Sequence, residues 1–286
     1  MKKIIFVLCA CFSGSIFSGN ADLLNMGYVE VNSNSLANVG CYVRSDTNKP
    51  LFQMAAIFAA NINGKNPNEP EVYFNPQVDS LLNHSDQVAK LQKQGIKVLL
   101  SILGNHQNAG WACMTDAAAI QQFANQMVNI INKYHLDGID IDDEYSTCSP
   151  NSTSMIKIAR ALKANPGFKG KLLTKVLFND YSYFIATDEG QQLADFIDYG
   201  WEMTYWSSNF NRRLGPYLQY GMLKNNLGLG VDSANVLPGP AAKFVLQNGY
   251  KGMMVYGITN NVQDYLTPLA QVEYGGKVNI LPNCLQ

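Results

Sequence analysis

The sequence predicts an α/β fold, a single-domain (β/α)8 TIM barrel, and three observations support this prediction. From Gly27 onward, short apolar runs alternate with amphipathic stretches, as in repeated β-α units around a parallel sheet. Eight such units can be counted within residues 22–286. No linker or low-complexity segment divides the chain, although its 286 residues suit two domains as well as one barrel. In such a barrel, the active site lies at the C-terminal ends of the strands.

The apolar runs are predicted as strands and the amphipathic stretches as helices. Strands are expected near 27–32, 54–61, 96–103, 136–143, 171–177, 197–205, 227–231 and 252–257. Apolar residues from Ile120 to Tyr134 recur at three- and four-residue steps, which predicts a helix with Thr115 or Asp116 as its N-cap. Another helix is expected over residues 152–164, before an Asn-Pro-Gly sequence. Residues 61–70 are expected to form a long loop after the second strand.

The N-terminal residues 1–21 have the layout of a secretory signal peptide. A pair of lysines precedes an apolar run from Ile4 to Phe12, and small residues follow. We expect cleavage at the end of this segment or a few residues earlier, which leaves residues 22–286 as the mature domain. Residues 8–11 resemble a lipoprotein box only vaguely. The expected location is therefore secreted or periplasmic.

Composition and charge exclude several kinds of partner. The chain is 47% hydrophobic and 15% charged, with a net charge of −1 and a pI near 6.3. A balance this close to neutral argues against nucleic acid as a partner and favours a neutral substrate. No apolar run reaches the roughly 20 residues that a membrane span requires, so we expect no membrane association after signal cleavage. We expect a monomer.

The cysteines of the exported domain are predicted to form disulfides. Four remain after the leader, Cys41, Cys113, Cys148 and Cys284, which allow three connectivities. Cys113 follows the third predicted strand and Cys148 the fourth, and neighbouring strands of a barrel bring such loops together. We therefore favour Cys113–Cys148, which leaves Cys41 to pair with Cys284. None of these cysteines has the spacing of zinc ligands.

The stretch from Asp137 to Glu144 carries five carboxylates in eight positions. Its isoleucines fall at every second residue, as in a strand buried on one face. Asp140, Asp142 and Glu144 should therefore point the same way, with roughly 6.5–7 Å between neighbours. Mutual repulsion and burial both raise carboxylate pKa values, so at least one of these acids should hold its proton near neutral pH. Glu144 then has the properties of a general acid.

Two other interpretations of this acidic stretch are a solvated loop and a calcium loop. A solvated loop does not explain the alternation of the isoleucines. A calcium loop of the helix-loop-helix type requires glycine at its sixth position, where Tyr145 stands if Asp140 is the first ligand. We expect no metal and no cofactor.

Asp-Gly-Ile-Asp-Ile-Asp-Asp-Glu, residues 137–144, resembles the D-G-x-D-x-D-x-E signature of glycoside hydrolase family 18. This family contains chitinases and endo-β-N-acetylglucosaminidases. Residues 28–32, 57–63 and 97–107 also resemble the bacterial endoglycosidase H branch. The resemblance spans nearly the whole mature chain and is closest up to about Tyr145.

The resemblance implies a retaining mechanism in which the substrate supplies the nucleophile. The 2-acetamido oxygen of an N-acetylglucosamine would attack the anomeric carbon while Glu144 protonates the leaving oxygen. Asp142 would hold the acetamido N–H, and Asp140 would share a proton with Asp142. The Met-x-Tyr of residues 203–205 matches the family's strand six, which makes Tyr205 the expected donor to the acetamido carbonyl. Glu30 is expected either to face the barrel interior as a partner of these acids or to line a wet bottom layer.

Amide and aromatic residues at the predicted strand ends are candidates for binding sugar, since amides bind hydroxyls and aromatic faces stack on pyranose rings. These candidates are Asn61, Asn63, Asn105, Trp111, Phe178, Asn179, Trp206, Tyr256 and Asn260. His106 is expected to have a structural hydrogen-bonding role.

The leading functional hypothesis is an exported endo-β-N-acetylglucosaminidase that cuts the N,N′-diacetylchitobiose core of N-linked glycans. The partner would be a glycan that contains N-acetylglucosamine. One alternative is a chitinase with the same chemistry on chitin or chito-oligosaccharides. A second alternative is a glycan-binding protein on an inactive hydrolase scaffold, although Asp142 and Glu144 are both intact.

Overall fold

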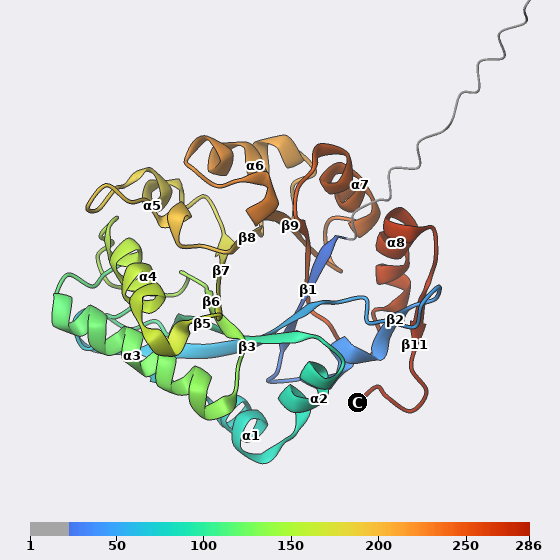
Figure 1. The fold of residues 1–286 in the computed structure, drawn as a ribbon, viewed down its shortest axis with the longest axis horizontal. Helices are drawn as coiled ribbons and strands as arrows, with labels where there is room; N and C mark the ends of the chain where they lie inside the picture. Colours follow the sequence, from blue (N-terminus) through green and yellow to red (C-terminus); the bar gives the residue numbers. More distant parts are fainter. Residues whose placement is uncertain (1–22) are drawn as a thin grey trace, which may run out of the picture.

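The computed structural model describes residues 23–286, and its main feature is a closed ring of parallel strands with helices outside it (Figure 1). The predicted leader, residues 1–21, lies outside the described residues. The ring consists of β1 (Leu24–Glu30), β3 (Met54–Asn63), β5 (Lys97–Gly104), β6 (Gly138–Ile141), β7 (Leu172–Leu177), β8 (Tyr199–Glu202), β9 (Leu227–Asp232) and β10 (Gly252–Tyr256). Because β1 pairs in parallel with both β10 and β3, the barrel is closed.

All eight predicted barrel strands are present, and two of them are shorter than predicted by four residues or more. β6 covers only residues 138–141 of the expected 136–143, and β8 covers only residues 199–202 of the expected 197–205. Beyond Ile141 the chain leaves the sheet, although Asp142 still donates its backbone N–H to the carbonyl of Ile102 at 3.1 Å. The acidic motif is therefore half strand and half loop.

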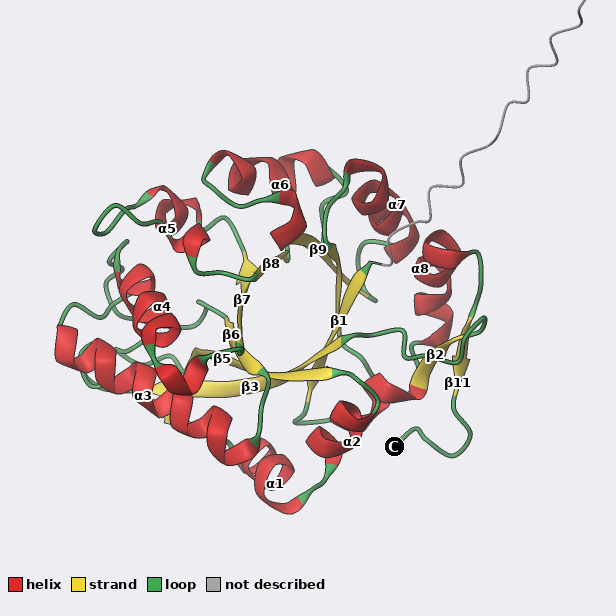
Figure 2. Cartoon of the chain, in the orientation of Figure 1, coloured by secondary structure: helices red, strands yellow, loops and turns green. Residues whose placement is uncertain are grey.

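Helices surround the barrel and cover its outer side (Figure 2). They are α1 (Pro76–His84), α2 (Gln87–Lys93), α3 (Ala117–Tyr134), α4 (Ser154–Ala164), α5 (Tyr181–Ile185), α6 (Phe210–Gln219), α7 (Pro238–Asn248) and α8 (Gln263–Tyr274), with short 3-10 turns at Leu36–Cys41, Pro166–Phe168, Leu193–Asp195 and Lys224–Asn226. Asp116 is the N-cap of α3, and its side chain accepts a hydrogen bond from the N–H of Ala119 at 2.8 Å. This agrees with one of the two caps predicted from the sequence.

Three short strands were not predicted. β4 (Glu71–Tyr73) pairs antiparallel with the end of β3. The expected loop over residues 61–70 therefore begins later, and Asn61 and Asn63 belong to β3 itself. β2 (Tyr42–Arg44) and β11 (Val278–Ile280) form a separate two-stranded sheet. Such three-residue strands carry too little periodicity to be recognised in the sequence.

The core has two parts, one inside the barrel and one between the barrel and the helices. The inner part is formed by side chains from alternate positions of the strands. Its buried members are Met26, Tyr28, Met54, Ala56, Leu99, Val176, Trp201, Met203 and Met254. The outer part is larger and includes Ile139 and Ile141, on the opposite face of β6. The barrel interior is therefore filled, and a substrate can approach the acids only from the mouth.

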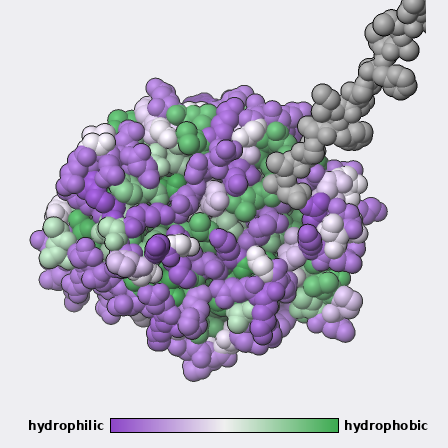
Figure 3. Space-filling model, viewed as in Figure 1, coloured by the Kyte–Doolittle hydropathy of each residue, from purple (hydrophilic) through white to green (hydrophobic). Residues whose placement is uncertain are grey.

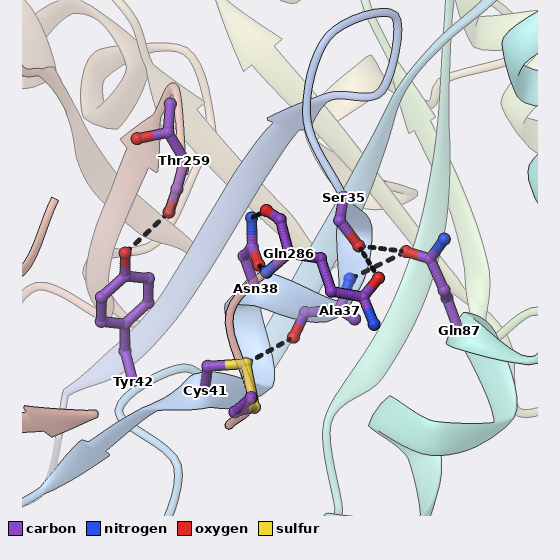
Figure 4. The surroundings of a disulfide bond; sticks show 9 residues. Ser35, Ala37, Asn38, Cys41, Tyr42, Gln87, Thr259 and Gln286 are labelled. Atoms are coloured by element: carbon purple, nitrogen blue, oxygen red, sulfur yellow. Dashed lines mark hydrogen bonds between the residues drawn. A yellow bond between two sulfur atoms is a disulfide. The ribbon is translucent and has the colours of Figure 1, made fainter. Parts of the chain in front are cut away.

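Both predicted disulfides are present. Cys113–Cys148 joins the loop after β5 to the loop after β6. Cys41–Cys284 joins two segments that are 243 residues apart in the sequence. Around this second disulfide, Gln286 accepts hydrogen bonds from Asn38 and from the Ser35 hydroxyl (Figure 4). Two disulfides in one domain are typical of exported proteins.

The molecular surface in the view of Figure 3 is mainly hydrophilic, and hydrophobic residues are exposed in small separate areas. Within residues 23–286, no helix has both the length and the apolar character needed to cross a membrane.

Candidate active site

Strand β6 and the loop after it place three acids at the mouth of the barrel. Asp140 and Asp142 are 0% and 2% exposed. Glu144 follows in the loop and is half-buried. The charge of Glu144 raises the pKa values of both Asp142 and Tyr205, so these three side chains lie in one electrostatic environment. The structure thus brings together the residues expected at the catalytic centre.

Asp140 is enclosed by hydroxyl groups from three other strands. Tyr28 of β1 donates to Oδ2 at 2.5 Å, Ser101 of β5 donates to Oδ2 at 2.9 Å, and Thr174 of β7 donates to Oδ1 at 2.5 Å. Burial raises the pKa of Asp140, and the three hydroxyl donors oppose that rise. These hydroxyls occupy Asp140, and no hydrogen bond to Asp142 is seen among the described residues, so the proton expected to be shared between Asp140 and Asp142 stays a prediction.

Asp142 is buried, but it lacks such partners. Its Oδ1 atom has no hydrogen-bond partner among the described residues. Burial and then the negative charges of Glu144 and Asp140 raise its pKa well above the usual range, while Lys175 lowers it. An unpaired buried acceptor costs free energy. The unpaired Oδ1 atom of Asp142 is best explained by a ligand that donates a hydrogen bond to this atom when the ligand binds.

The backbone of the Glu144 loop is held by the loop after β5. The carbonyl of Glu144 accepts the N–H of Gly104 at 2.9 Å, and the carbonyl of Tyr145 accepts the N–H of His106 at 2.6 Å. A Cβ atom at Gly104 would lie 2.6 Å from the Glu144 carbonyl oxygen, so this approach requires glycine. Burial raises the pKa of the Glu144 carboxyl. Glu144 is therefore fixed at its backbone and biased toward the protonated form.

Tyr205 lies three residues beyond the end of β8 and reaches the same mouth. Its ring stacks on Tyr256 with centroids 6.0 Å apart. Burial, followed by the charge of Asp142, raises its pKa well above the usual range, which keeps the hydroxyl protonated. The hydroxyl lies 3.8 Å from the Met254 sulfur, a weak acceptor, so its proton is available to a stronger acceptor on a substrate.

The amide candidates at the ends of β3 and β5 already contact each other. Asn105 Nδ2 donates to Asn63 Oδ1 at 2.7 Å, and Asn61 Nδ2 donates to the Gly104 carbonyl at 3.1 Å. Asn260 is exposed in the loop after β10. These residues lie at or just after the C-terminal ends of β3, β5 and β10.

The loops after β7 and β8 present exposed aromatic rings. Phe178 and Trp206 are 37% and 64% exposed, and their rings meet edge to face with centroids 5.7 Å apart. Beside Trp206 is a hollow of about 500 Å³ with a mainly polar lining. Its lining includes Asn179, Tyr181, Thr204, Ser207, Asn209 and Arg212.

Two candidates do not take the places predicted for them. Trp111 is 0% exposed, packs against Phe123 and donates its indole N–H to the carbonyl of Ile102 at 2.7 Å, so it cannot stack on a sugar. Glu30 is exposed at the C-terminal end of β1, where its charge raises the pKa of Tyr256. The partner that β1 offers to the acids is Tyr28, two residues earlier on the same face. Glu30 is therefore at the mouth, neither beside Asp140 nor in a bottom layer.

Sequence reasoning missed four residues that surround the acids: Tyr28, Ser101, Thr174 and Lys175. Lys175 gave a detectable signal, since it is the one charged residue of β7, which is mainly apolar. The three hydroxyl residues gave none, because their partner lies on another strand. Among residues 23–286, no group of three or more His, Cys, Asp or Glu side chains is arranged to hold a metal ion.

Comparisons with known proteins agree with this geometry. A model of the family described as glycosyl hydrolases family 18 matches residues 18–235. The chain is 34% identical over 263 residues to an endo-beta-N-acetylglucosaminidase of Flavobacterium sp. (strain SK1022), which covers 88% of this chain and 80% of the relative. It is 28% identical over 256 residues to endo-beta-N-acetylglucosaminidase F1 of Elizabethkingia meningoseptica, which covers 86% and 74%.

Among solved structures, the chain is similar to EndoBT-3987 of Bacteroides thetaiotaomicron with a Man5GlcNAc product. The TM-score is 0.77 at 25% identity, over 93% of this chain. The chain spans 64% of the length of that protein's chain.

Proposed function

The chain belongs to family 18 of the glycosyl hydrolases, and we propose that it is an exported endo-β-N-acetylglucosaminidase. It hydrolyses the β-1,4 bond of the N,N′-diacetylchitobiose core of N-linked glycans. Two relatives that align with most of the chain carry the name of this activity. The observation that carries the proposal is the buried, unpaired Oδ1 of Asp142 beside Glu144 and Tyr205.

The first step needs an acid and a nucleophile at the anomeric carbon. Glu144, whose pKa is raised by burial, donates its proton to the leaving oxygen as the glycosidic bond breaks. The acetamido oxygen of the glycone N-acetylglucosamine forms the new bond to the anomeric carbon, which gives an oxazolinium ion. The reaction therefore requires an N-acetylglucosamine on the glycone side of the bond that is cut.

Asp142 and Tyr205 bind the two ends of the reacting acetamido group. Asp142 Oδ1 accepts the acetamido N–H, which becomes more acidic as positive charge develops on the oxazolinium ring. Tyr205 donates its hydroxyl proton to the acetamido carbonyl and orients it toward the anomeric carbon. The contact with Asp142 strengthens in the transition state, which is the condition for an interaction to accelerate the reaction.

The second step regenerates the enzyme. Glu144, now a carboxylate, takes a proton from water as the water oxygen bonds to the anomeric carbon and the bond to the acetamido oxygen breaks. Two displacements leave the anomeric configuration unchanged. Asp140, held by three hydroxyls, acts on Asp142 through its charge.

We also propose that the rim of the barrel binds the rest of the glycan. The exposed faces of Phe178 and Trp206 suit stacking on pyranose rings, and Tyr256 extends this aromatic surface beside Tyr205. Asn179 and the hollow beside Trp206 offer hydrogen-bonding groups for sugar hydroxyls. Asn61, Asn63, Asn105 and Asn260 do the same at the ends of β3, β5 and β10.

Export is proposed from the disulfides and the predicted leader together. Two disulfides persist in oxidising compartments, which supports a secreted or periplasmic location. Residues 22–286 would then act as one monomeric catalytic domain after removal of residues 1–21.

The test is to incubate the protein with a high-mannose glycoprotein and, separately, with chitin oligomers. We expect the glycoprotein to move faster on a denaturing gel and to retain one N-acetylglucosamine per site by mass spectrometry, while chitin oligomers stay intact. Glu144→Gln is the matched control, because it keeps the shape of the side chain but cannot donate the proton. Cleavage of chitin without cleavage of the glycoprotein would contradict the proposal.

A further inference from the structure

A lysine is buried in the barrel wall directly behind the acidic motif. Lys175 of β7 is 1% exposed. Its neighbours Thr174 and Val176 point into the barrel, so Lys175 points to the outer side, where Ile141 is its partner in register. Its Nζ atom lies 2.6 Å from Asp180 Oδ2 and donates to the Val176 carbonyl at 3.0 Å. A buried charge is costly unless it is paired, and the fold itself does not require one here.

The pair formed by Lys175 and Asp180 is held from several elements. Tyr217 of α6 donates to Asp180 Oδ1 at 2.6 Å, and the N–H of Phe178 donates to the same atom at 3.3 Å. Burial lowers the pKa of Lys175, but the charges of Asp180 and Asp143 outweigh it and raise the pKa. Lys175 therefore remains a cation over the whole range in which carboxylates titrate.

Asp143 connects this cation to the catalytic loop. It stands between Asp142 and Glu144 but belongs to the opposite face of the chain, where it accepts a hydrogen bond from Tyr183 of α5. Burial raises its pKa to about 6, and the charge of Lys175 lowers it. Without the cation, this half-buried carboxylate would be harder to ionise and would lose the attraction of the Lys175 charge.

We propose that Lys175 is a positioning residue for the catalytic acids: its buried ammonium, held by Asp180, attracts the carboxylate of Asp143 and so fixes the loop that carries Glu144. This inference rests on the proposed function of Glu144. The loop leaves β6 after Ile141, and its backbone is held on one side by Ile102 and Gly104 of β5. The loop after β5 binds its backbone on one side, and Lys175 anchors its side chains on the other.

The same cation acts on all of the acids. Its charge lowers the pKa values of Asp140, Asp142, Asp143 and Glu144, and burial raises each of them. The titratable groups that face this cluster from the surrounding elements are Tyr28, Asp180, Tyr183, Tyr205, Tyr217 and Tyr256. Lys175 is the one cation that acts on all four acids in the described chain. Removing the charge of Lys175 should therefore raise the pKa values of all four acids.

The test is the Lys175→Met variant, which keeps the aliphatic bulk and removes the charge. We expect kcat on the glycoprotein to fall about tenfold, because Glu144 is no longer held in position. KM should change little, because the residues that bind the sugar are unaffected. Both limbs of the pH profile of kcat/KM should move to higher pH by about half a unit or more. Lys163→Met is the matched control. Lys163 lies on α4, and its Nζ atom also pairs with an aspartate, Asp198, at 2.5 Å. Its pH profile should equal that of the wild type.

The Asp143→Asn variant gives a second test with the opposite sign. It removes the anion beside Asp142 and Glu144, so the limbs should move to lower pH while kcat again falls. A folded Lys175→Met protein with unshifted limbs would overturn the proposal, even if kcat fell, because a purely structural role predicts that result. Where Lys175→Met does not fold, unshifted limbs in Asp143→Asn would overturn it equally.

A titration read by carboxyl ¹³C NMR separates this inference from the proposed function. The pKa of Asp143 should rise from about 6 to a higher value in Lys175→Met, whatever the substrate of the protein is. An inactive wild-type protein would contradict the proposed function alone. An active wild type whose Asp143 titrates identically with and without Lys175 would contradict the inference alone.

Discussion

Asp140 and Asp142 stand two residues apart, are nearly equally buried, and have opposite surroundings. Asp140 receives three hydroxyl hydrogen bonds from three strands. Asp142 Oδ1 has no partner within residues 23–286. A buried carboxylate with all its partners supports the architecture, whereas one without a partner is complete only when a substrate binds. From this comparison we propose that Asp140 organises the site and that Asp142 acts on the sugar.

The largest loss of activity is expected when Glu144 is replaced, because neither Asp140 nor Asp142 can supply its proton. Glu144→Gln removes the proton that the leaving oxygen needs, so kcat on a glycoprotein should fall by about 10³-fold. The melting temperature should change little, because the side chain makes few contacts and keeps its volume. The measurement is a gel-shift time course together with a thermal melt. Activity within tenfold of the wild type would show that another group supplies the proton.

The Asp142→Asn variant tests the unpaired side of the comparison. An amide cannot stabilise the positive oxazolinium ring, so kcat should fall by about 10²-fold. Stability should be unchanged or higher, because a buried carboxylate without a partner is replaced by a neutral group. Urea unfolding at pH 7 measures this. A clear loss of stability would mean that Asp142 has structural partners in the folded protein.

A smaller loss of activity is expected when the second acetamido contact is removed. Tyr205→Phe keeps the ring that stacks on Tyr256 and deletes only the hydroxyl. We expect kcat to fall by about 10- to 100-fold with an unchanged fold. Tyr256→Phe is the control, because its hydroxyl has no role in the proposed chemistry. Equal losses in both variants would argue against a specific role for the Tyr205 hydroxyl.

The paired side of the comparison is tested by Asp140→Ala. This substitution leaves the hydroxyls of Tyr28, Ser101 and Thr174 buried without their acceptor, which should lower the free energy of unfolding by about 3 kcal/mol. Ser101→Ala removes one donor and should cost less. If Asp140→Ala were as stable as the wild type, Asp140 would not be the structural member of the pair.

The smallest effect concerns Asp143, on the outer side of the same loop. Its pKa of about 6 lies above the usual 3.8, so the folded protein holds this proton more tightly than the unfolded chain. Between these two pH values the unfolded state binds fewer protons, and stability therefore falls as pH rises. Asp143→Asn lacks this effect. The melting temperature of Asp143→Asn minus that of the wild type should therefore increase from pH 4 to pH 7. A difference that stays constant over this range would exclude a raised pKa of Asp143.

The barrel could be predicted because its signal is repeated along the whole chain. Each strand contributes an apolar run of the right length, and Asp116 marks the start of α3. The acidic motif predicted where the candidate site lies, since alternation alone put Asp140 and Asp142 on one side. The Cys113–Cys148 disulfide was predicted from the order of the strands, and this pairing left Cys41 to pair with Cys284.

What the sequence did not reveal depends on contacts between distant segments. Trp111 looked like a rim aromatic, yet it is buried against α3 because the loop after β5 folds back onto the helix. Glu30 and Tyr28 share a face of β1, and depth along the barrel alone decides which of them meets Asp140. The shortening of β6 leaves Glu144 on a loop, whose backbone bonds to Gly104 at the end of β5 and to His106 beyond it.

The central claim is that Asp142 acts on the acetamido group of the substrate and not on the rest of the reaction. It is tested most directly by the rate at which Asp142→Asn hydrolyses a preformed sugar oxazoline, compared with an intact glycopeptide. The oxazoline already contains the ring whose formation Asp142 assists. We expect a loss of about 10²-fold on the glycopeptide and less than about tenfold on the oxazoline. Equal losses on both substrates would contradict this role.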